Sequence, residues 1–185
     1  MTLTKTPVCD FGKKAEDFKL KSINNKLISL NEIKGEKATL IMFICNHCPY
    51  VKAIIKDLVK DSNELKKDGI NTVAIMSNDT KNYPEDSFDN MIKFAEENNF
   101  KKINYLIDET QEIAKTYGAV CTPDFFGYNK YLELQYRGRF KELKDLKPIN
   151  NGDSDLKVAM KMITQTQKGP DEQIPSMGCN IKWLK

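Results

Sequence analysis

The sequence predicts an α/β fold in which helices flank a central sheet and a β-hairpin precedes it. The apolar run at residues 40–44 is typical of a strand buried on both faces, and from Pro49 apolar residues recur at the spacing of one helix face. Residues 70–76 and 103–107 are two more apolar segments after helical patterns. This strand–helix–strand order predicts parallel strands joined by right-handed crossovers.

The chain ahead of the first long strand predicts a hairpin. Residues up to about 14 form an extended lead-in. Residues 18–21 and 27–30 alternate apolar and polar side chains, and the pair Asn24-Asn25 between them indicates a turn. A short helical turn is expected over residues 30–33.

Two long helices connect the expected parallel strands. The first begins near Pro49 and ends at Gly69, which stands where a helix commonly needs a left-handed residue. For the second, Pro84 is suited to the first helical turn, and Asn98-Asn99 ends the apolar pattern.

A short helix is expected after the third parallel strand. Its apolar pattern covers residues 111–117, and Gly118 closes it. Asp108 or Thr110 is the expected cap, because both side chains accept hydrogen bonds from a first turn.

The last third of the chain predicts a hairpin and one more helix. Residues 125–128 and 131–136 are the hairpin strands, with Asn129-Lys130 as the turn. Residues 141–153 are polar and loop-like. The final helix starts after Asp153 or Ser154.

Length and composition fit one domain over residues 1–185, with a tail from about 168 to 185. The net charge is +3 and the lysines alternate with acidic residues, so no nucleic-acid surface is predicted. No signal peptide or membrane-spanning segment is recognised. The expected location is the cytoplasm, where we expect the five cysteines to be thiols and not a disulfide framework.

The Cys-x-x-Cys pair, Cys45 and Cys48, lies where the buried strand passes into the first helix. Unpaired N–H groups and the positive end of the helix dipole stabilise a thiolate there. One thiolate can attack a disulfide and the other thiol can resolve the mixed disulfide. His47 between them, if cationic, further favours the thiolate.

A structural zinc site and a pair of inert core cysteines are the alternatives for this motif. Zinc would need a second closely spaced ligand pair. Cys9, Cys121 and Cys179 are isolated, and His47 is the only histidine. We therefore expect no metal and no cofactor, and we favour a redox pair over inert packing.

The order of elements resembles the thioredoxin superfamily over almost the whole chain. Two local matches carry the resemblance: Cys45-Asn46-His47-Cys48 at the helix start and Thr122-Pro123 before the second hairpin. The resemblance implies a thioredoxin-like fold with a mixed central sheet. It also implies a cis-proline at Pro123, beside the disulfide, in a groove that presents the substrate backbone.

A narrower resemblance is to the peroxiredoxin-like branch, related to alkyl hydroperoxide reductase and thiol-specific antioxidant, that carries Cys-x-x-Cys. It rests on six segments in order: CNHCPY at 45–50, YPEDS at 83–87, LIDET at 106–110, CTPDFF at 121–126, YRGR at 136–139 and GCNIKW at 178–183.

The sequence departs from both families at specific positions. Thioredoxin has Trp before the first cysteine and a buried Asp six residues before it; here these are Ile44 and Thr39. The usual proton acceptor is therefore missing. Peroxiredoxins have Thr or Ser where Cys45 stands and an Arg near the cis-proline, whereas Arg137 and Arg139 come well after it.

The function we expect is thiol–disulfide oxidoreduction, contributing to redox homeostasis, on protein or small-molecule disulfides with a thiol reductant. Cys45 is assigned the attack, because the first cysteine of such pairs is the more exposed one, and Cys48 resolves. His47 tunes the thiolate, and Thr122 and Pro123 shape the substrate groove. If Pro49 is the first helical residue, however, Cys48 is the helix cap and gains most from the dipole.

Two other functions remain open. One is an antioxidant thiol peroxidase with Cys48 as the peroxidatic residue. The other is a protein that binds a metal ion or a partner through the same thiols without turnover. Cys121 and Cys179 are candidate accessory thiols: Cys121 is a core residue or a third redox thiol, and Cys179 is a resolving or a packed one.

Overall fold

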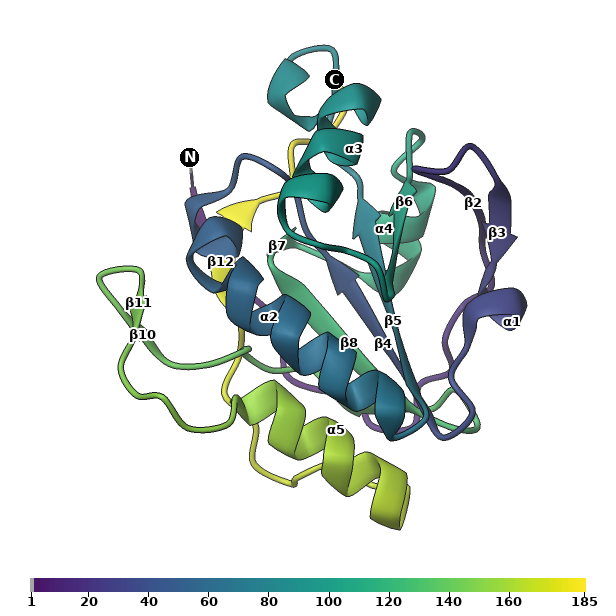
Figure 1. Cartoon of the computed structure of the whole chain (residues 1–185), viewed down its shortest axis with the longest axis vertical. Coiled ribbons are helices and arrows are strands. Elements are labelled where there is room, and N and C mark those ends of the chain that lie inside the picture. Colours follow the sequence, from purple (N-terminus) through teal and green to yellow (C-terminus); the bar gives the residue numbers. More distant parts are fainter. Residues whose placement is uncertain (1) are drawn as a thin grey trace.

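The computed structural model describes residues 2–185, and within them a mixed sheet of seven strands forms the centre (Figure 1). The strands β4, β5 and β6 run parallel, and the other neighbours in this sheet are antiparallel. This confirms the predicted fold class. In spatial order the strands are β3 (Leu27–Ser29), β2 (Lys19–Ser22), β6 (Ile103–Ile107), β5 (Ile70–Met76), β4 (Ala38–Phe43), β8 (Asp124–Asn129) and β9 (Leu134–Tyr136).

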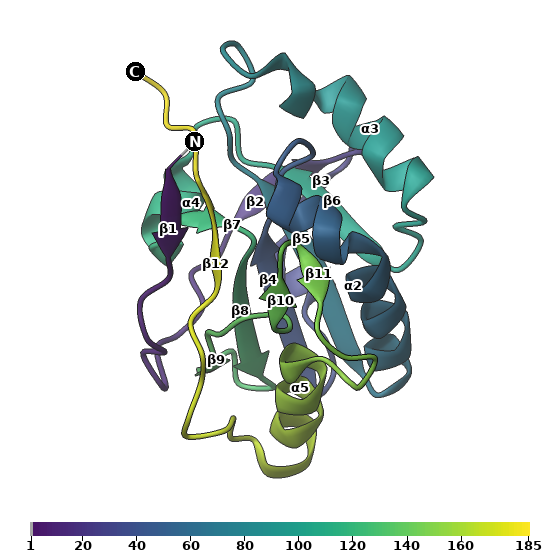
Figure 2. The same ribbon diagram turned by 90° about the vertical axis from the view of Figure 1, so that its left-hand side faces the viewer.

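Helices cover both faces of this sheet. One face carries α2 (Pro49–Lys67), α3 (Phe88–Glu97) and α5 (Asp155–Thr166), and the other carries α1 (Leu30–Ile33) and α4 (Glu112–Tyr117) (Figures 1 and 2). All six residues of β4 are buried, as the continuous apolar run predicts.

The side chains of β4 alternate between two hydrophobic clusters. Leu40 and Met42 pack with the residues of α2 and α5, whereas Ile41 and Phe43 face the other side. There the Phe43 ring lies 5.8 Å from Tyr117 and 5.7 Å from Phe126. Packing on both faces fixes the end of β4, which leads directly into the cysteine pair.

The helix α2 begins at Pro49, so Cys48 is its N-cap. Pro at the first helical position has no N–H to leave unpaired, and its fixed φ suits the helix. The helix ends as expected, with Gly69 just beyond it at φ +83°.

The segment after β5 differs from the prediction of one helix starting at Pro84. Pro84 opens a short 3-10 helix, η1 (Pro84–Asp86), and α3 starts only at Phe88. Ser87 between them is extended, with φ −56° and ψ 157°. This break turns the side chain of Asp86 inward, where it is fully buried.

The short helix α4 has Gln111 at its N-cap position instead of Asp108 or Thr110. The carboxylate of Asp108 nevertheless accepts hydrogen bonds from the N–H groups of Ala114 (2.9 Å) and Ile113 (3.4 Å). Asp108 therefore caps the first turn of α4, as expected, although it does not occupy the N-cap position. Gln111 occupies that position in a left-handed conformation, with φ 63°.

The second hairpin has a longer connection than the predicted two-residue turn. The side-chain oxygen of Asn129 accepts from the N–H groups of Tyr131 and Glu133, both at 3.0 Å, so the loop closes around this side chain. Residues 141–153, predicted as loop, contain a small ladder of β10 (Leu143–Lys144) and β11 (Lys147–Pro148). The final helix has Ser154 as its cap, as expected.

The two ends of the chain form a second sheet that the sequence pattern did not indicate. β12 (Met177–Asn180) lies between β1 (Leu3–Lys5) and β7 (Cys121–Thr122), and it is antiparallel to both (Figure 2). The predicted tail is thus fixed beside the segment that holds Thr122. In residues 2–185, no helix is both long and apolar enough to cross a membrane.

Candidate active site

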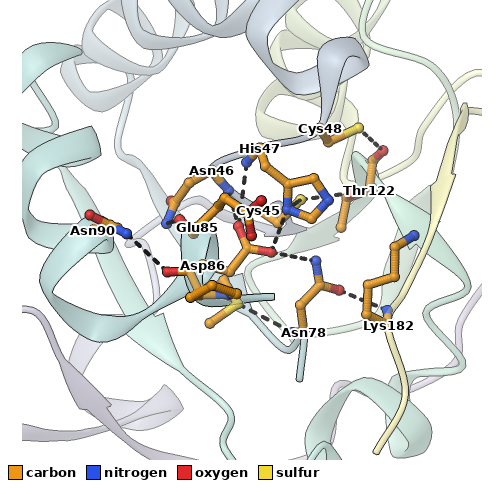
Figure 3. A network of polar contacts seen from close by, with 12 residues as sticks. Cys45, Asn46, His47, Cys48, Asn78, Glu85, Asp86, Asn90, Thr122 and Lys182 are labelled. Atoms are coloured by element: carbon orange, nitrogen blue, oxygen red, sulfur yellow. Dashed lines mark hydrogen bonds and ion pairs between the residues drawn. The ribbon is translucent and has the colours of Figure 1, made fainter. Parts of the chain in front are cut away.

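The two cysteines meet at the segment before Pro123. The Cys48 Sγ donates to the carbonyl oxygen of Thr122 at 3.1 Å, and the Cys45 Sγ lies 3.4 Å from the Thr122 hydroxyl (Figure 3). The Thr122–Pro123 peptide bond is cis, as the resemblance implied. The expected difference in exposure between the thiols is absent, because Cys45 is 1% and Cys48 is 0% exposed.

The environment favours Cys48 as the thiolate. Hydrogen bonding from the Cys45 thiol, aided by the N–H of Val51 in the first turn of α2 and by both the N–H and the thiol of Cys179, lowers the pKa of Cys48 to about 5. The same interaction with Cys48, then burial and the charge of Asp86, raises the pKa of Cys45 well above its ordinary value. The hydrogen bond from the Cys45 thiol thus outweighs the burial of Cys48, and the N–H groups of Val51 and Cys179 add to it.

His47 is held by a buried carboxylate. Its Nδ1 lies 2.7 Å from the Oδ2 of Asp86, and the Cys45 Sγ is 3.9 Å from the same nitrogen (Figure 3). This contact with Asp86 raises the pKa of His47 above its ordinary value. Burial opposes ionisation of Asp86, but the hydrogen bonds from His47 and Asn78 hold the pKa of Asp86 below its usual range. With Asp86 ionised, Nδ1 carries a hydrogen and donates the hydrogen bond to Asp86, so this nitrogen is not a base toward Cys45, and the raised pKa favours the cationic form of His47.

Asp86 also organises the loop between the two cysteines. It accepts from the backbone N–H groups of Asn46 (2.8 Å) and His47 (3.3 Å) and from the side-chain amide of Asn78 (2.8 Å). The hydroxyl of Tyr105, on β6, donates to the Asn46 side chain at 2.8 Å. Together with the Nδ1 of His47, these two backbone N–H groups and the Asn78 amide give Asp86 four hydrogen-bond donors, which compensate the burial of its charge.

Sequence reasoning missed Asp86, Asn78 and Tyr105 as members of this site. The YPEDS segment was among the matching motifs, yet it gave no indication that its aspartate turns inward. Thr39 stands where thioredoxin has a buried Asp, and its hydroxyl accepts a hydrogen bond from the Gly35 N–H at 2.9 Å. A carboxylate is therefore present beside the thiols, but it comes from η1.

An aromatic ring covers the imidazole. Tyr83 is stacked on His47, with ring centroids 5.9 Å apart and planes within 7°. The Nζ of Lys182 lies 5.7 Å from the Tyr83 ring, and the backbone N–H of Lys182 donates to Asn78. Tyr83, just before η1, and Lys182, near the chain end, thus partly cover His47, whose side chain is 12% exposed.

The remaining cysteines occupy three different environments. Cys179, on β12, is 4% exposed and touches Cys48. Cys121 is fully buried, but its Sγ points to the Pro123 carbonyl at 3.6 Å. Cys9 packs on the sheet face opposite to Cys45 and Cys48.

Both arginines of the YRGR segment are bound to carboxylates. Arg137 is buried against Asp124, at 3.0 Å, and also donates to the Gly118 carbonyl at 2.7 Å. Arg139 pairs with Asp155 at 2.6 Å and with Glu142 at 3.3 Å. Neither guanidinium contacts the cysteine pair.

One set of side chains here has the donor types of a metal site. Ligand atoms of Cys45, His47 and Asp86 lie within 4.8 Å of one another. An ion held by Nδ1 of His47 and Oδ2 of Asp86 would have to displace the proton between these two atoms, which lie 2.7 Å apart. In the structure, His47 and the buried Asp86 are bound to each other beside the Cys45 thiol.

Comparison with known proteins gives a family and a fold. The family model described as AhpC/TSA family matches residues 11–141. A search of curated proteins gave no match.

Two solved structures resemble the chain along nearly all of its length. An uncharacterized conserved protein from Geobacillus kaustophilus is 40% identical, with 100% of this chain and 97% of that chain covered and a TM-score of 0.89. A hypothetical protein from Sinorhizobium meliloti is 35% identical, with 98% of each chain covered and a TM-score of 0.90.

A more distant structure has the same fold. The thioredoxin domain of a thiol-disulfide oxidoreductase from Bacteroides vulgatus is 18% identical, covers 69% of this chain and 86% of its own, and has a TM-score of 0.58. The thioredoxin-like fold expected from the sequence is thus confirmed.

Proposed function

Because the chain belongs to the AhpC/TSA family and has the thioredoxin fold, we propose that it is an oxidoreductase that exchanges thiols and disulfides through Cys45 and Cys48. The observation that carries the proposal is the pairing of two thiols at the start of α2, with one in an environment that stabilises the thiolate. Such a thiolate is the species that attacks disulfides.

The proposed reaction starts at Cys48. Its thiolate attacks one sulfur of a substrate disulfide, so that a mixed disulfide forms and the other substrate sulfur leaves as a thiolate. Cys45 then loses its proton and attacks the Cys48 sulfur. The Cys45–Cys48 disulfide forms, the second substrate sulfur leaves, and it takes up the proton from Cys45.

These roles reverse the assignment that the sequence favoured. Cys45 was assigned the attack because the first cysteine was expected to be more exposed, but both side chains are buried to the same degree. Cys48 has more hydrogen-bond donors around it, and Asp86 disfavours a negative charge on Cys45. The pKa of His47 is raised mainly by its hydrogen bond to Asp86 and to a smaller extent by the charge of Cys48, so a cationic His47 supports the Cys48 thiolate.

A thiol peroxidase is the second candidate. The family match and a thiolate next to Pro49 favour it. In that reaction Cys48 would attack the peroxide, water would leave, and Cys45 would condense with the resulting sulfenic acid, with release of a second water. Against it, both Arg137 and Arg139 are bound to carboxylates, so neither guanidinium is available to stabilise the leaving oxygen.

A side-by-side turnover assay distinguishes the candidates. Oxidised glutathione and hydrogen peroxide are compared as substrates, with dithiothreitol as the reductant. We expect the disulfide to be turned over and hydrogen peroxide to react slowly. Cys48→Ser should abolish turnover, whereas Cys121→Ser, which removes an equally buried thiol that points away, should keep it.

The outcomes are separable. Fast, saturable consumption of peroxide that is lost in Cys48→Ser would replace the proposal by the second candidate. Absence of both reactions in a folded protein would refute an enzymatic role for the pair.

A further inference from the structure

Strand β12 brings a third thiol to the cysteine pair. Cys179 pairs with Thr122 in the antiparallel register of β12 and β7. The carbonyl of Thr122 accepts from Cys48 and its hydroxyl touches Cys45. Because paired residues of neighbouring strands share a face, the Cys179 side chain lies on the same side of this small sheet as the Thr122 hydroxyl.

The approach of β12 is close. A Cβ on Gly178 would lie 2.1 Å from the Thr122 carbonyl oxygen, so only glycine fits at this position. The strand is also held from its other side by β1, where Leu3 pairs with Cys179. Cys179 is therefore placed by backbone pairing on two sides and does not depend on a flexible tail.

Cys179 and Cys48 are in direct contact. Both the N–H and the thiol of Cys179 are among the groups that lower the pKa of Cys48. Burial, followed by this contact, raises the pKa of Cys179 to about 12. Both sulfur atoms belong to the same buried cluster, together with Cys45.

We propose that Cys179 is a third redox residue, an internal exchange partner that can form a disulfide with Cys48. The inference rests on the proposed function, because it requires Cys48 to enter disulfides. In the oxidised protein, the Cys179 sulfur attacks the Cys48 sulfur of the Cys45–Cys48 disulfide. The Cys48–Cys179 bond forms, the Cys45–Cys48 bond breaks, and Cys45 leaves as a thiolate that takes the proton given up by Cys179.

This exchange involves no net oxidation, so it needs no further reactant. Its result is an oxidised protein in which Cys45 is again a thiol and β12 is tied covalently to the start of α2. The same attack on a mixed disulfide at Cys48 would release the substrate without Cys45. Cys179 is thus a second resolving thiol for the same nucleophile.

Cys121 provides the matched control within the chain. It is one residue before Thr122, is fully buried and pairs with Asn180, the neighbour of Cys179. Successive residues of a strand face opposite sides, and the Cys121 Sγ is directed at the Pro123 carbonyl. Cys121 lies close to the site but faces the other side of the strand, so we expect it to form no disulfide with Cys48.

The test maps disulfides after oxidation of Cys45→Ser with diamide. The protein is quenched in acid, unfolded, alkylated and cut with trypsin without reduction. Cleavage after lysine separates the thiols into peptides 38–52, 116–130 and 169–182. We expect peptide 38–52 linked to 169–182, the same link in Cys45→Ser/Cys121→Ser, and none in Cys45→Ser/Cys179→Ser.

Separate, fully alkylated peptides in folded Cys45→Ser, or equal linkage to 116–130, would refute the inference. If circular dichroism shows that Cys45→Ser is unfolded, wild-type protein in a series of dithiothreitol redox buffers decides instead. There, linkage of 38–52 to 169–182 that disappears in Cys179→Ser supports the inference, and a disulfide confined to 38–52 at every ratio refutes it.

The wild-type sample also separates this inference from the proposed function. If no Cys45–Cys48 disulfide forms within peptide 38–52 and no 38–52 to 169–182 link appears, both proposals fail. If the Cys45–Cys48 disulfide forms but no link to 169–182 appears, only the role of Cys179 is refuted.

Discussion

Cys48 and Cys121 have the same side chain and the same burial, yet their surroundings act in opposite directions. Both are 0% exposed and both lie beside the Thr122–Pro123 segment. Burial, with the nearby Asp124, raises the pKa of Cys121 far above its ordinary value. Cys48, at the start of α2 with several donors around it, has a pKa lowered to about 5.

The difference shows that burial alone does not decide whether a thiol is reactive. Removal from water disfavours the thiolate in both places. At Cys48 this cost is offset by the N–H groups of Val51 and Cys179 and by two thiol donors. Each Sγ also faces a carbonyl oxygen, that of Thr122 at 3.1 Å for Cys48 and that of Pro123 at 3.6 Å for Cys121, so it is the donors around Cys48 that distinguish the two thiols.

The largest expected effect is in the pH profiles of the two thiols. A lowered pKa means that Cys48 is ionised above about pH 5, so alkylation by iodoacetamide should rise between pH 4 and 6 and then level off. Cys121 should stay unreactive until the protein unfolds. At pH 7 Cys48 should be mostly thiolate and Cys121 almost entirely thiol.

Mass spectrometry of the tryptic peptides measures both profiles in one sample. Each profile is scaled to its own maximum, so that access of the reagent cancels. A Cys48 profile that keeps rising to pH 8 or 9, as for an ordinary thiol, would contradict the comparison.

Asp86→Asn should have the next largest effect. The new amide would place N–H donors against the Nδ1 proton of His47 and the amide of Asn78, which now donate to Asp86. We expect the free energy of unfolding at pH 7 to fall by about 3 kcal/mol, as when a buried ion pair loses one partner. Urea titration measures this change.

The same variant should lower the pKa of His47, because the contact that raises it is lost. His47 is the only histidine, so its proton NMR titration is unambiguous. Asp124→Asn is the control: it breaks another buried ion pair, with Arg137, and should destabilise the protein without moving the His47 titration. An unchanged His47 pKa in Asp86→Asn would disprove the coupling.

His47→Gln should give a smaller change, confined to the reactive thiol. Loss of the cation should raise the pKa of Cys48, by less than loss of one of its hydrogen-bond donors would. The alkylation profile would shift to higher pH by the same amount as the pKa. Tyr83→Leu, which removes the ring stacked on His47 but no charge, should leave the profile in place.

Tyr105→Phe should have the smallest effect. It removes the hydroxyl that donates to the Asn46 side chain and keeps the buried ring. We expect a loss of about 1 kcal/mol in the free energy of unfolding. The pKa of Cys48 should not move, because the contacts of Cys48 are unaffected; a shift would mean that the Asn46 loop also sets its ionisation.

Much of the fold followed from local patterns in the sequence. The apolar runs of β4, β5 and β6, and the helix between Pro49 and Gly69, appear where their periodicity predicted them. In two of the segments that differed, a side chain overrides local preference. Asp86 breaks the expected helix, and the Asn129 side chain enlarges the hairpin turn.

The candidate site was only partly accessible from the sequence. The motif placed Cys45, His47 and Cys48 together, and the family resemblance added Thr122 and Pro123. Asp86 lies 39 residues beyond His47, and Cys179 lies at the far end of the chain. Contacts between residues so far apart leave no periodic pattern in the sequence. The hydrogen-bond donors that distinguish Cys48 from Cys45 could therefore be identified only from the structure.

The most direct test of the account is which cysteine forms the mixed disulfide. Cys179 can release an adduct on Cys48, so the comparison is made between Cys45→Ser/Cys179→Ser and Cys48→Ser/Cys179→Ser. Each is incubated with oxidised glutathione at pH 7, quenched in acid and analysed by intact mass spectrometry. The account predicts a glutathione adduct that accumulates in Cys45→Ser/Cys179→Ser and is absent from the other. An adduct trapped only in Cys48→Ser/Cys179→Ser would show that Cys45 attacks, and would contradict the assignment of the thiolate to Cys48.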